Sequence, residues 1–449
     1  MNFRTLFVCL CLAASAAIGV VAQQPRAADH PSIAYDTSAP ADRIARLQSA
    51  IDSGAVALEF DEQRGYLPSL LRALEIPVSS QGLVFSRTSL QVDRIAPWTP
   101  RAVYFNDDAY VGWVQDGPIM EVATVDPALG AVFYTLKQEQ GSRPVFERQG
   151  RTCLQCHDSS STTGGVPGLI MRSVFADRYG YVVPSDQGVT TDRTPLADRW
   201  GGWYVTGTLG SQPHMGNVIA PLVGHDIVNP AAYLTKLRAQ PNPALTELSA
   251  RFDPAPYLAP HSDAVALMVL AHQTSIHNLI TAATYEARRA AYDDKLTAAS
   301  RGGDSPAAQS EGARVRIESA GERLVRAMLF VKEAPLTQPV AGTSAFAAEF
   351  SQQGKRDPKG RSLRDLDLSQ RLFRYPLSFL IYSESFDAMP PVVKGYVYKR
   401  LREVLTGEDK RPEFTHLSPA DRDAIRQILE ETKPEFTSAA CCPTSRAAF

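Results

Sequence analysis

One five-residue stretch limits what this 449-residue chain can fold into more than any other feature. Cys153-Leu154-Gln155-Cys156-His157 reads C-x-x-C-H, with two thiols three positions apart and an imidazole directly after the second. Thiols at this spacing can add to the two vinyl groups of one haem, and the adjacent histidine then lies under the iron as an axial ligand. Chance alone would produce the pattern about 0.001 times in a chain of this composition. The motif therefore predicts one covalently attached haem c, with His157 as the proximal iron ligand.

Two other uses of a C-x-x-C pair fit this sequence less well. A thiol redox site lies at a strand-to-helix step of a βαβ unit, usually with Gly-Pro or similar residues between the cysteines, where Leu154 and Gln155 stand here. A structural zinc site needs two further ligands at a suitable spacing. Apart from the N-terminal segment, the remaining cysteines are Cys441 and Cys442, adjacent to each other near the C-terminal end.

The N-terminus has the layout of a secretory signal peptide. Arg4 precedes an uncharged apolar run over residues 6–21, and small residues come before Gln23. The run is short beside the roughly 20 apolar residues of a membrane span, although an uncleaved anchor is the alternative. Cleavage near Ala22 predicts an exported, periplasmic chain without a membrane span, and export agrees with haem attachment outside the cytoplasm.

The charge balance limits the class of partner. The chain has 46 Lys+Arg and 48 Asp+Glu, a formal net charge of -2, so it has no basic excess for nucleic acid or an anionic membrane. With 44% apolar residues it can build cores large enough to be stable unaided. We expect a redox partner protein or a small-molecule substrate, and no nucleic acid.

The hydrophobic pattern changes period along the chain and predicts an α+β protein. Residues 42–74 have a helical spacing, and short strand-like runs between Arg101 and Leu136 are separated by turn residues, which predicts an antiparallel β meander. A second β-like patch comes within 169–208. A long helix is expected from Ser262 or Asp263 to about Leu296, with further helices over 315–331 and 392–405.

Around its motif the chain resembles the c-type cytochromes, and it is similar to a large group of exported mono-haem proteins of cytochrome c-like type. In small cytochromes c the motif leads into a glycine-containing loop and a proline, and here Gly164-Gly165-Val166-Pro167-Gly168-Leu169 stands at that place. The resemblance implies that the Pro167 carbonyl accepts the hydrogen bond of His157, which fixes the imidazole tautomer. It also implies a C-terminal helix beside the haem, for which residues 392–405 are the candidate.

The resemblance implies a fold and a domain organisation. The expected fold is a mainly α-helical cytochrome c-like haem domain with large insertions, preceded by the antiparallel β meander. The expected units are a signal peptide over 1–22, a helical segment plus meander over 23–140, and the haem domain with β and helical insertions over 141–449.

The sixth iron ligand decides between an electron carrier and an enzyme, because an open position permits binding or catalysis. Met215 lies 58 residues after His157, a separation typical of small cytochromes c, and His214 stands beside it. Met389 precedes Pro390, as this ligand does in the family, but it lies 232 residues from His157. Either Met215 or His214 is the first choice for closing the coordination sphere.

A histidine on the long predicted helix could close the coordination sphere instead, or the position could stay open. His272 and His277 share that helix five residues apart, so they point about 140° away from each other and could not both face one haem. His225 and His261 are weaker candidates. Trp200 and Trp203 could pack on a haem edge or belong to a β core, and the basic loop over 355–374 could bind haem propionates or simply be solvated.

The sequence therefore predicts an exported mono-haem c-type cytochrome that transfers electrons. The alternative is a haem-dependent oxidoreductase, peroxidase-like or acting on a small substrate, or a haem-based ligand sensor, each with an open sixth iron site.

Overall fold

The computed structural model describes residues 26–141, 143–183, 188–221, 229–240, 242, 245–301 and 309–438. The signal peptide expected over 1–22, the tail cysteines Cys441 and Cys442, and His225 lie outside the described residues.

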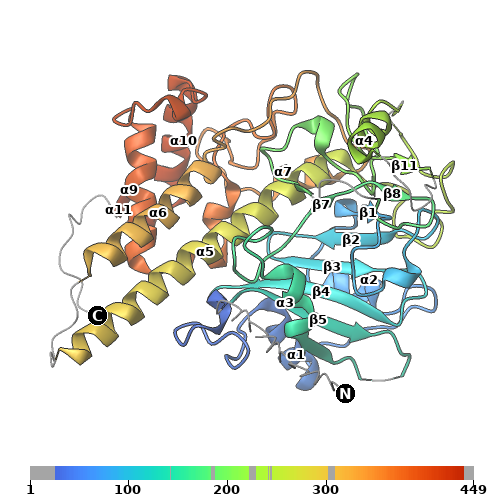
Figure 1. Ribbon diagram of the computed structural model, residues 1–449, viewed down its shortest axis with the longest axis horizontal. Helices are drawn as coiled ribbons and strands as arrows, with labels where there is room; N and C mark the ends of the chain where they lie inside the picture. Colours follow the sequence, from blue (N-terminus) through green and yellow to red (C-terminus); the bar gives the residue numbers. More distant parts are fainter. Residues whose placement is uncertain are drawn as a thin grey trace, which may run out of the picture.

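A seven-stranded antiparallel sheet is the centre of one half of the molecule (Figure 1). Its spatial order is β10-β1-β2-β3-β4-β5-β6, so neighbouring strands from β1 to β6 are also consecutive in sequence. The expected meander corresponds to the four strands β2 to β5. The strands of the sheet are β1 (Gly82–Val84), β2 (Arg101–Phe105), β3 (Ala109–Trp113), β4 (Ile119–Asp126), β5 (Gly130–Lys137), β6 (Phe146–Gln149) and β10 (Trp203–Tyr204).

Turn chemistry sets the register of the longest strand pair. At the β4–β5 turn the Asp126 carboxylate accepts hydrogen bonds from the amides of Ala128 and Leu129, and Gly130 has a φ of 75°. Two smaller two-stranded sheets lie beyond the main one. They pair β7 (Arg172–Ser173) with β9 (Gly188–Val189), and β8 (Ala176–Asp177) with β11 (Ile219–Ala220).

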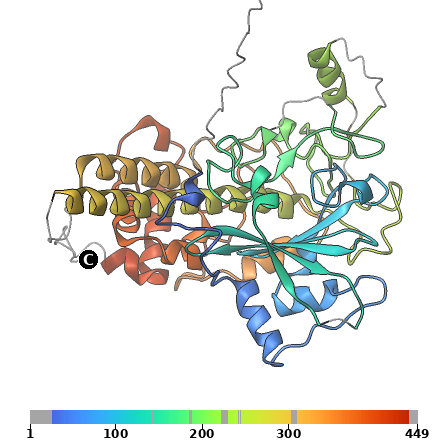
Figure 2. The ribbon, with the colours of Figure 1, turned by 60° about the horizontal axis from the view of Figure 1, so that its bottom comes forward.

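Helices cover both faces of the sheet (Figure 2). One face packs on α1 (Arg43–Asp52) and α2 (Leu67–Ala73). The buried Asp42 carboxylate caps α1 by accepting from the amides of Ile44 and Ala45, and it also accepts from the hydroxyl of Tyr134 on β5 at 2.7 Å. The opposite face packs on α3 (Arg151–His157) and α5 (Ala264–Ser300).

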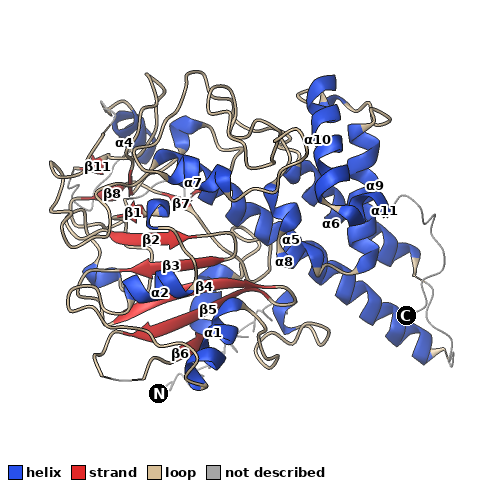
Figure 3. Ribbon diagram, turned by 180° about the vertical axis from the view of Figure 1, so that it is seen from behind, coloured by secondary structure: helices blue, strands red, loops and turns tan. Residues whose placement is uncertain are grey.

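Helix α5 joins the sheet half to a helical half, as Figure 3 shows from behind. It runs for 37 residues, and the carboxylate of Asp263 caps it by accepting from the amides of Val265 and Ala266. The long helix expected after Ser262 or Asp263 is therefore confirmed. The remaining helices are α4 (Pro230–Arg238), α6 (Glu311–Met328), α7 (Phe346–Gln352), α8 (Glu384–Asp387), α9 (Pro391–Leu405), α10 (Pro419–Thr432) and α11 (Pro434–Ser438). Short 3₁₀ helices cover Ala27–Asp29, Val78–Ser80, Val92–Arg94, Leu196–Asp198, Phe379–Tyr382 and Pro412–Phe414.

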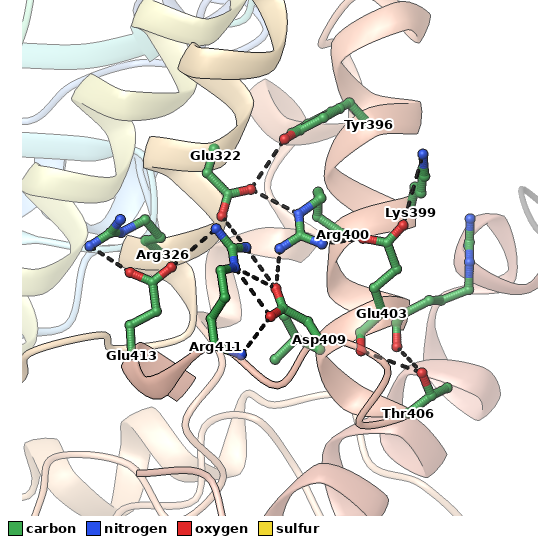
Figure 4. A network of polar contacts seen from close by, with 12 residues as sticks. Glu322, Arg326, Tyr396, Lys399, Arg400, Glu403, Thr406, Asp409, Arg411 and Glu413 are labelled. Carbon is green, nitrogen blue, oxygen red and sulfur yellow. Dashed lines mark hydrogen bonds and ion pairs between the residues drawn. The ribbon is translucent and has the colours of Figure 1, made fainter. Parts of the chain in front are cut away.

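An ion-pair network fastens the helical half (Figure 4). Arg400 on α9 pairs with Glu322 on α6 at 2.9 Å, and it also contacts Glu403 and Asp409. Arg411 bonds to both Glu322 and Asp409 at 2.7 Å. The network ties α6, α9 and the segment after α9 together, which fixes the angle between the two helices. Within the described ranges, no helix is both long and apolar enough to cross a membrane.

The expected fold class is wrong. The antiparallel sheet is a large, integral part of the molecule, and no mainly helical cytochrome c-like domain stands apart from it within the described residues. β6 and β10 come from beyond residue 140 and complete the sheet, so a boundary there does not separate the sheet from the C-terminal part of the chain. Helix α9, the expected counterpart of the family's C-terminal helix, packs against α5, α6 and α10 instead of the motif helix.

Candidate functional site

The C-x-x-C-H motif forms the short helix α3 on one face of the sheet (Figure 1). The edge strand β6 ends at Gln149, and Gly150 turns the chain directly into α3. Leu154 is buried and anchors the helix in the main apolar core. Consequently the three motif side chains are held in one short helix against the sheet.

The two thiols differ in their surroundings. Cys153 is half-buried against the main core, whereas Cys156 is exposed, and neither forms a disulfide within the described residues. Burial raises the pKa of the Cys153 thiol to about 11, with smaller contributions from Glu121 and Cys156. Cys153 is therefore a protonated thiol at neutral pH, which does not fit the activated thiolate of a redox C-x-x-C pair.

The imidazole of His157 is held by a backbone carbonyl. Its Nδ1 lies 2.9 Å from the carbonyl oxygen of Gly168, and its ring lies 4.6 Å from that of Phe133 on β5. A carbonyl can only accept, so Nδ1 carries the proton and Nε2 keeps its lone pair. Burial lowers the pKa of His157, and the bond to Gly168 opposes this shift.

The carbonyl that accepts from His157 is not the expected one. The Pro167 carbonyl instead accepts from the Ala131 amide at 3.1 Å, so it belongs to the contact between this loop and β5. The carbonyl that holds His157 therefore belongs to the residue after the one that the cytochrome c resemblance implies. The donor set still fits a haem of the c type, because one helix supplies two free thiols and one imidazole nitrogen with an available lone pair.

Two charged side chains that the sequence analysis missed lie beside the motif. Arg101 on β2 and Glu121 on β4 form an ion pair at 2.9 Å that crosses over Gly112 on β3, where no side chain intervenes. Both act electrostatically on Cys153 and His157. Arg101 Nε and Glu121 Oε1 are buried without a hydrogen-bond partner among the described residues. Polar residues at strand positions that face a helix would have been the signal in the sequence.

A cavity of about 230 Å³ lies beside the loop after the motif. Hydroxyl and amide side chains make up much of its lining, which includes Thr162, Thr163, Thr190, Thr191, Thr274, Ser275 and Asn278. The lining joins the motif loop to α5 and to the segment around β9.

Met215 and His214 pack against residues other than those of the motif. Met215 is buried in a smaller apolar cluster, separate from the main core against which Cys153 packs, and its sulfur lies 3.5 Å from the Ser173 hydroxyl. The His214 ring lies against Trp200, and its Nδ1 lies 2.9 Å from the Asn242 amide nitrogen. Met215 as sixth ligand stays a prediction that this packing does not favour.

The remaining candidate ligands also have established surroundings. His272 Nε2 lies 2.9 Å from the Ser378 hydroxyl, and His277 Nε2 lies 2.7 Å from the Asp107 carbonyl. The two rings thus point to different sides of α5, as their spacing predicts. Met389 is buried in the main core just after α8, and the half-buried His261 precedes α5.

The tryptophans and the basic loop have structural roles. Trp203 is part of β10 and donates from its indole to the Arg172 carbonyl at 2.8 Å, whereas Trp200 is fully buried. The basic loop over 355–374 pairs its charges internally or with neighbouring segments, through Arg356–Asp365, Arg361–Asp357, Arg364–Asp107 and Arg371–Asp421.

No protein-family model, curated protein or solved structure matches this chain. Within the described ranges, no group of three or more His, Cys, Asp or Glu side chains is placed so that it could hold a metal ion.

Proposed function

We propose that this chain is an exported mono-haem c-type cytochrome that transfers electrons, with haem attached at Cys153 and Cys156 and bound by His157. One observation carries the proposal. A single short helix holds two free thiols together with an imidazole whose Nδ1–H donates to the Gly168 carbonyl, so that Nε2 is available as an iron ligand.

Each residue of the motif has a definite task. Each of the two thiols would add across one vinyl group of the haem, with sulfur bonding to one carbon and hydrogen to the other, so attachment would need no oxidant and would have no leaving group. Leu154 anchors the helix in the core, and Phe133 and Gly168 fix the imidazole plane. Bound haem supplies an iron that exchanges one electron at a time.

The exposure of α3 is compatible with exchange between proteins. Cys156 is exposed while Cys153 and His157 are half-buried, so one side of the motif faces solvent. A redox partner protein can approach that side, and we therefore propose a protein partner before a small-molecule substrate.

The test is expression of the full chain in a host that exports proteins and attaches haem. We expect haem to remain bound after denaturation and the mass to agree with cleavage near Ala22. The visible spectrum should change reversibly between the oxidised and the reduced protein. The double variant Cys153→Ala/Cys156→Ala should lose covalent haem, and His157→Ala should keep the thioether bonds but change the iron's spectrum. His30→Ala, at a half-buried histidine that is not a candidate iron ligand, is the matched control and should behave as wild type. A wild-type chain without covalent haem refutes the proposal.

A second candidate function has its own support. Met215, His214, His272, His277 and Met389 are all buried, and the first four have a polar partner outside α3. A charged pair and a hydroxyl-lined cavity also lie near the motif. These features favour a haem-dependent oxidoreductase or ligand sensor with an open sixth position. Addition of CO discriminates between the two, because an immediate spectral shift indicates an open iron and an unchanged low-spin spectrum indicates a carrier.

A further inference from the structure

The segment 167–169, which holds the His157 ring, forms hydrogen bonds through the backbone of all three residues. The Pro167 carbonyl accepts from Ala131, and the Gly168 amide donates to the His157 carbonyl at 2.8 Å. The Gly168 carbonyl accepts from the His157 ring. Leu169 bonds on both sides to one side chain, that of Asn278 on α5. The segment 167–169 is thus held between β5, α3 and α5.

The side-chain amide of Asn278 forms two hydrogen bonds with the backbone of Leu169. The Leu169 amide donates to Asn278 Oδ1 at 2.8 Å, and Asn278 Nδ2 donates to the Leu169 carbonyl at 2.8 Å. Asn278 is buried in the middle of a helix that is itself buried over most of its length, so its position is well fixed. A Cβ on Gly168 would lie 2.5 Å from Asn278 Oδ1, which explains why glycine stands next to it.

The contact reaches His157 through a single peptide group. The Gly168 carbonyl and the Leu169 amide belong to the same peptide unit, which therefore accepts from His157 at one end and donates to Asn278 at the other. Hydrogen bonds in such a chain polarise one another, and each makes the next stronger. Asn278 thereby increases the negative charge on the oxygen that accepts from His157 Nδ1.

We infer that Asn278 is a positioning residue for the proximal ligand, which fixes the Nδ1–H tautomer of His157 and strengthens its Nε2 as a donor to iron. This inference rests on the proposed function as far as the iron is concerned, and it identifies a residue 121 positions away from the histidine it serves. Partners of this kind raise the basicity of a metal-bound imidazole. Loss of Asn278 should therefore favour reduced iron, because a weaker donor stabilises the oxidised form less.

The test compares two substitutions on the same buried helix. Asn278→Leu removes both bonds to Leu169, whereas Gln273→Leu removes a buried amide that bonds to the Tyr110 hydroxyl and the Asn106 carbonyl instead. In the haem-loaded protein, Asn278→Leu should shift the reduction potential to more positive values, by on the order of tenfold in the reduction equilibrium constant. Gln273→Leu should leave it close to wild type. Asn278→Asp keeps an oxygen acceptor for the Leu169 amide and should stay at or below the wild-type potential.

A haem-free measurement separates this inference from the proposed function. Imidazole nitrogen chemical shifts of the full chain without haem should show the Nδ1–H tautomer of His157 in wild type and in Gln273→Leu, and a tautomer mixture in Asn278→Leu. Asn278→Ala, which cannot overpack the site, must give the same result if Asn278→Leu fails to fold. An unchanged tautomer in these variants overturns the inference even if haem binds. A wild type without covalent haem refutes the proposed function and leaves the tautomer result to decide the role of Asn278.

Discussion

His272 makes the stability of this protein sensitive to acid. Its ring stacks on Phe330 with centroids 4.4 Å apart, its Nε2 lies 2.9 Å from the Ser378 hydroxyl, and its Nδ1 has no hydrogen-bond partner among the described residues. Protonation would place a charge in this apolar site without a counter-charge. Burial accordingly lowers the pKa of His272 to about 3, and the nearby His277 adds to the effect.

The sign and the size of the effect come from linkage. The unfolded chain binds a proton at His272 below a pKa of 6.5, whereas the folded chain does so only near 3. The contribution of neutral His272 to the free energy of unfolding is therefore fully present above pH 6.5, and it is lost as the pH decreases towards the folded-state pKa. At pH 5 the unfolded state is about 1.5 units below its pKa, which at about 1.4 kcal/mol per unit costs the folded state about 2 kcal/mol.

Urea unfolding of the wild type and of His272→Gln at pH 7.5 and pH 5 measures this contribution. Glutamine does not titrate, so the loss of unfolding free energy between the two pH values should be smaller in the variant by about 2 kcal/mol. The comparison between pH values cancels any constant cost of the substitution. Burial lowers the pKa of His214 to about 4, so His214→Gln should reduce the pH dependence of the unfolding free energy by a similar amount. If His272→Gln keeps the full wild-type pH dependence, the described burial of His272 is incorrect.

Further substitutions test the packing around the proposed site. Gly168→Ala should destabilise the fold by about 1–3 kcal/mol, because the new Cβ would lie 2.5 Å from Asn278 Oδ1 and 2.8 Å from Thr163 Cβ. At Gly164 a new Cβ would meet no atom within 4 Å but the φ is 77°, so Gly164→Ala should cost only about 1 kcal/mol. Thermal unfolding that finds Gly164→Ala less stable than Gly168→Ala contradicts the loop geometry. Met215→Leu should cost less than about 1.5 kcal/mol and leave the visible spectrum of the haem-loaded protein unchanged. A spectral change in that variant would instead identify Met215 as the sixth ligand.

Local features of the fold could be predicted because local residues determine them. Asp263 caps α5 with its own carboxylate, and turn residues such as Asp126 delimit the strands of the meander. The opposite directions of His272 and His277 result from helical spacing alone. Each of these properties depends on residues within a few positions of one another.

Features that depend on distant pairing could not be predicted in the same way. β10, at residues 203–204, adds itself to β1 at residues 82–84, and no local pattern in either segment specifies that partner. The fold-class prediction was wrong for a related reason. The cytochrome c resemblance covers only the motif and the loop after it, and such a short segment does not determine how the rest of the chain packs against it.

The acceptor of the His157 hydrogen bond shows how the two levels combine. The cytochrome c resemblance implies that the Pro167 carbonyl accepts from the imidazole, and the carbonyl of the next residue, Gly168, does so instead. Which carbonyl it is depends on two contacts from far along the chain, because Ala131 occupies the Pro167 oxygen and Asn278 holds Leu169. Together these contacts place the Gly168 oxygen opposite the ring. The geometry of the histidine therefore depends on β5 and α5 as much as on its own motif, and residues outside the motif are where the properties of a bound haem would be adjusted.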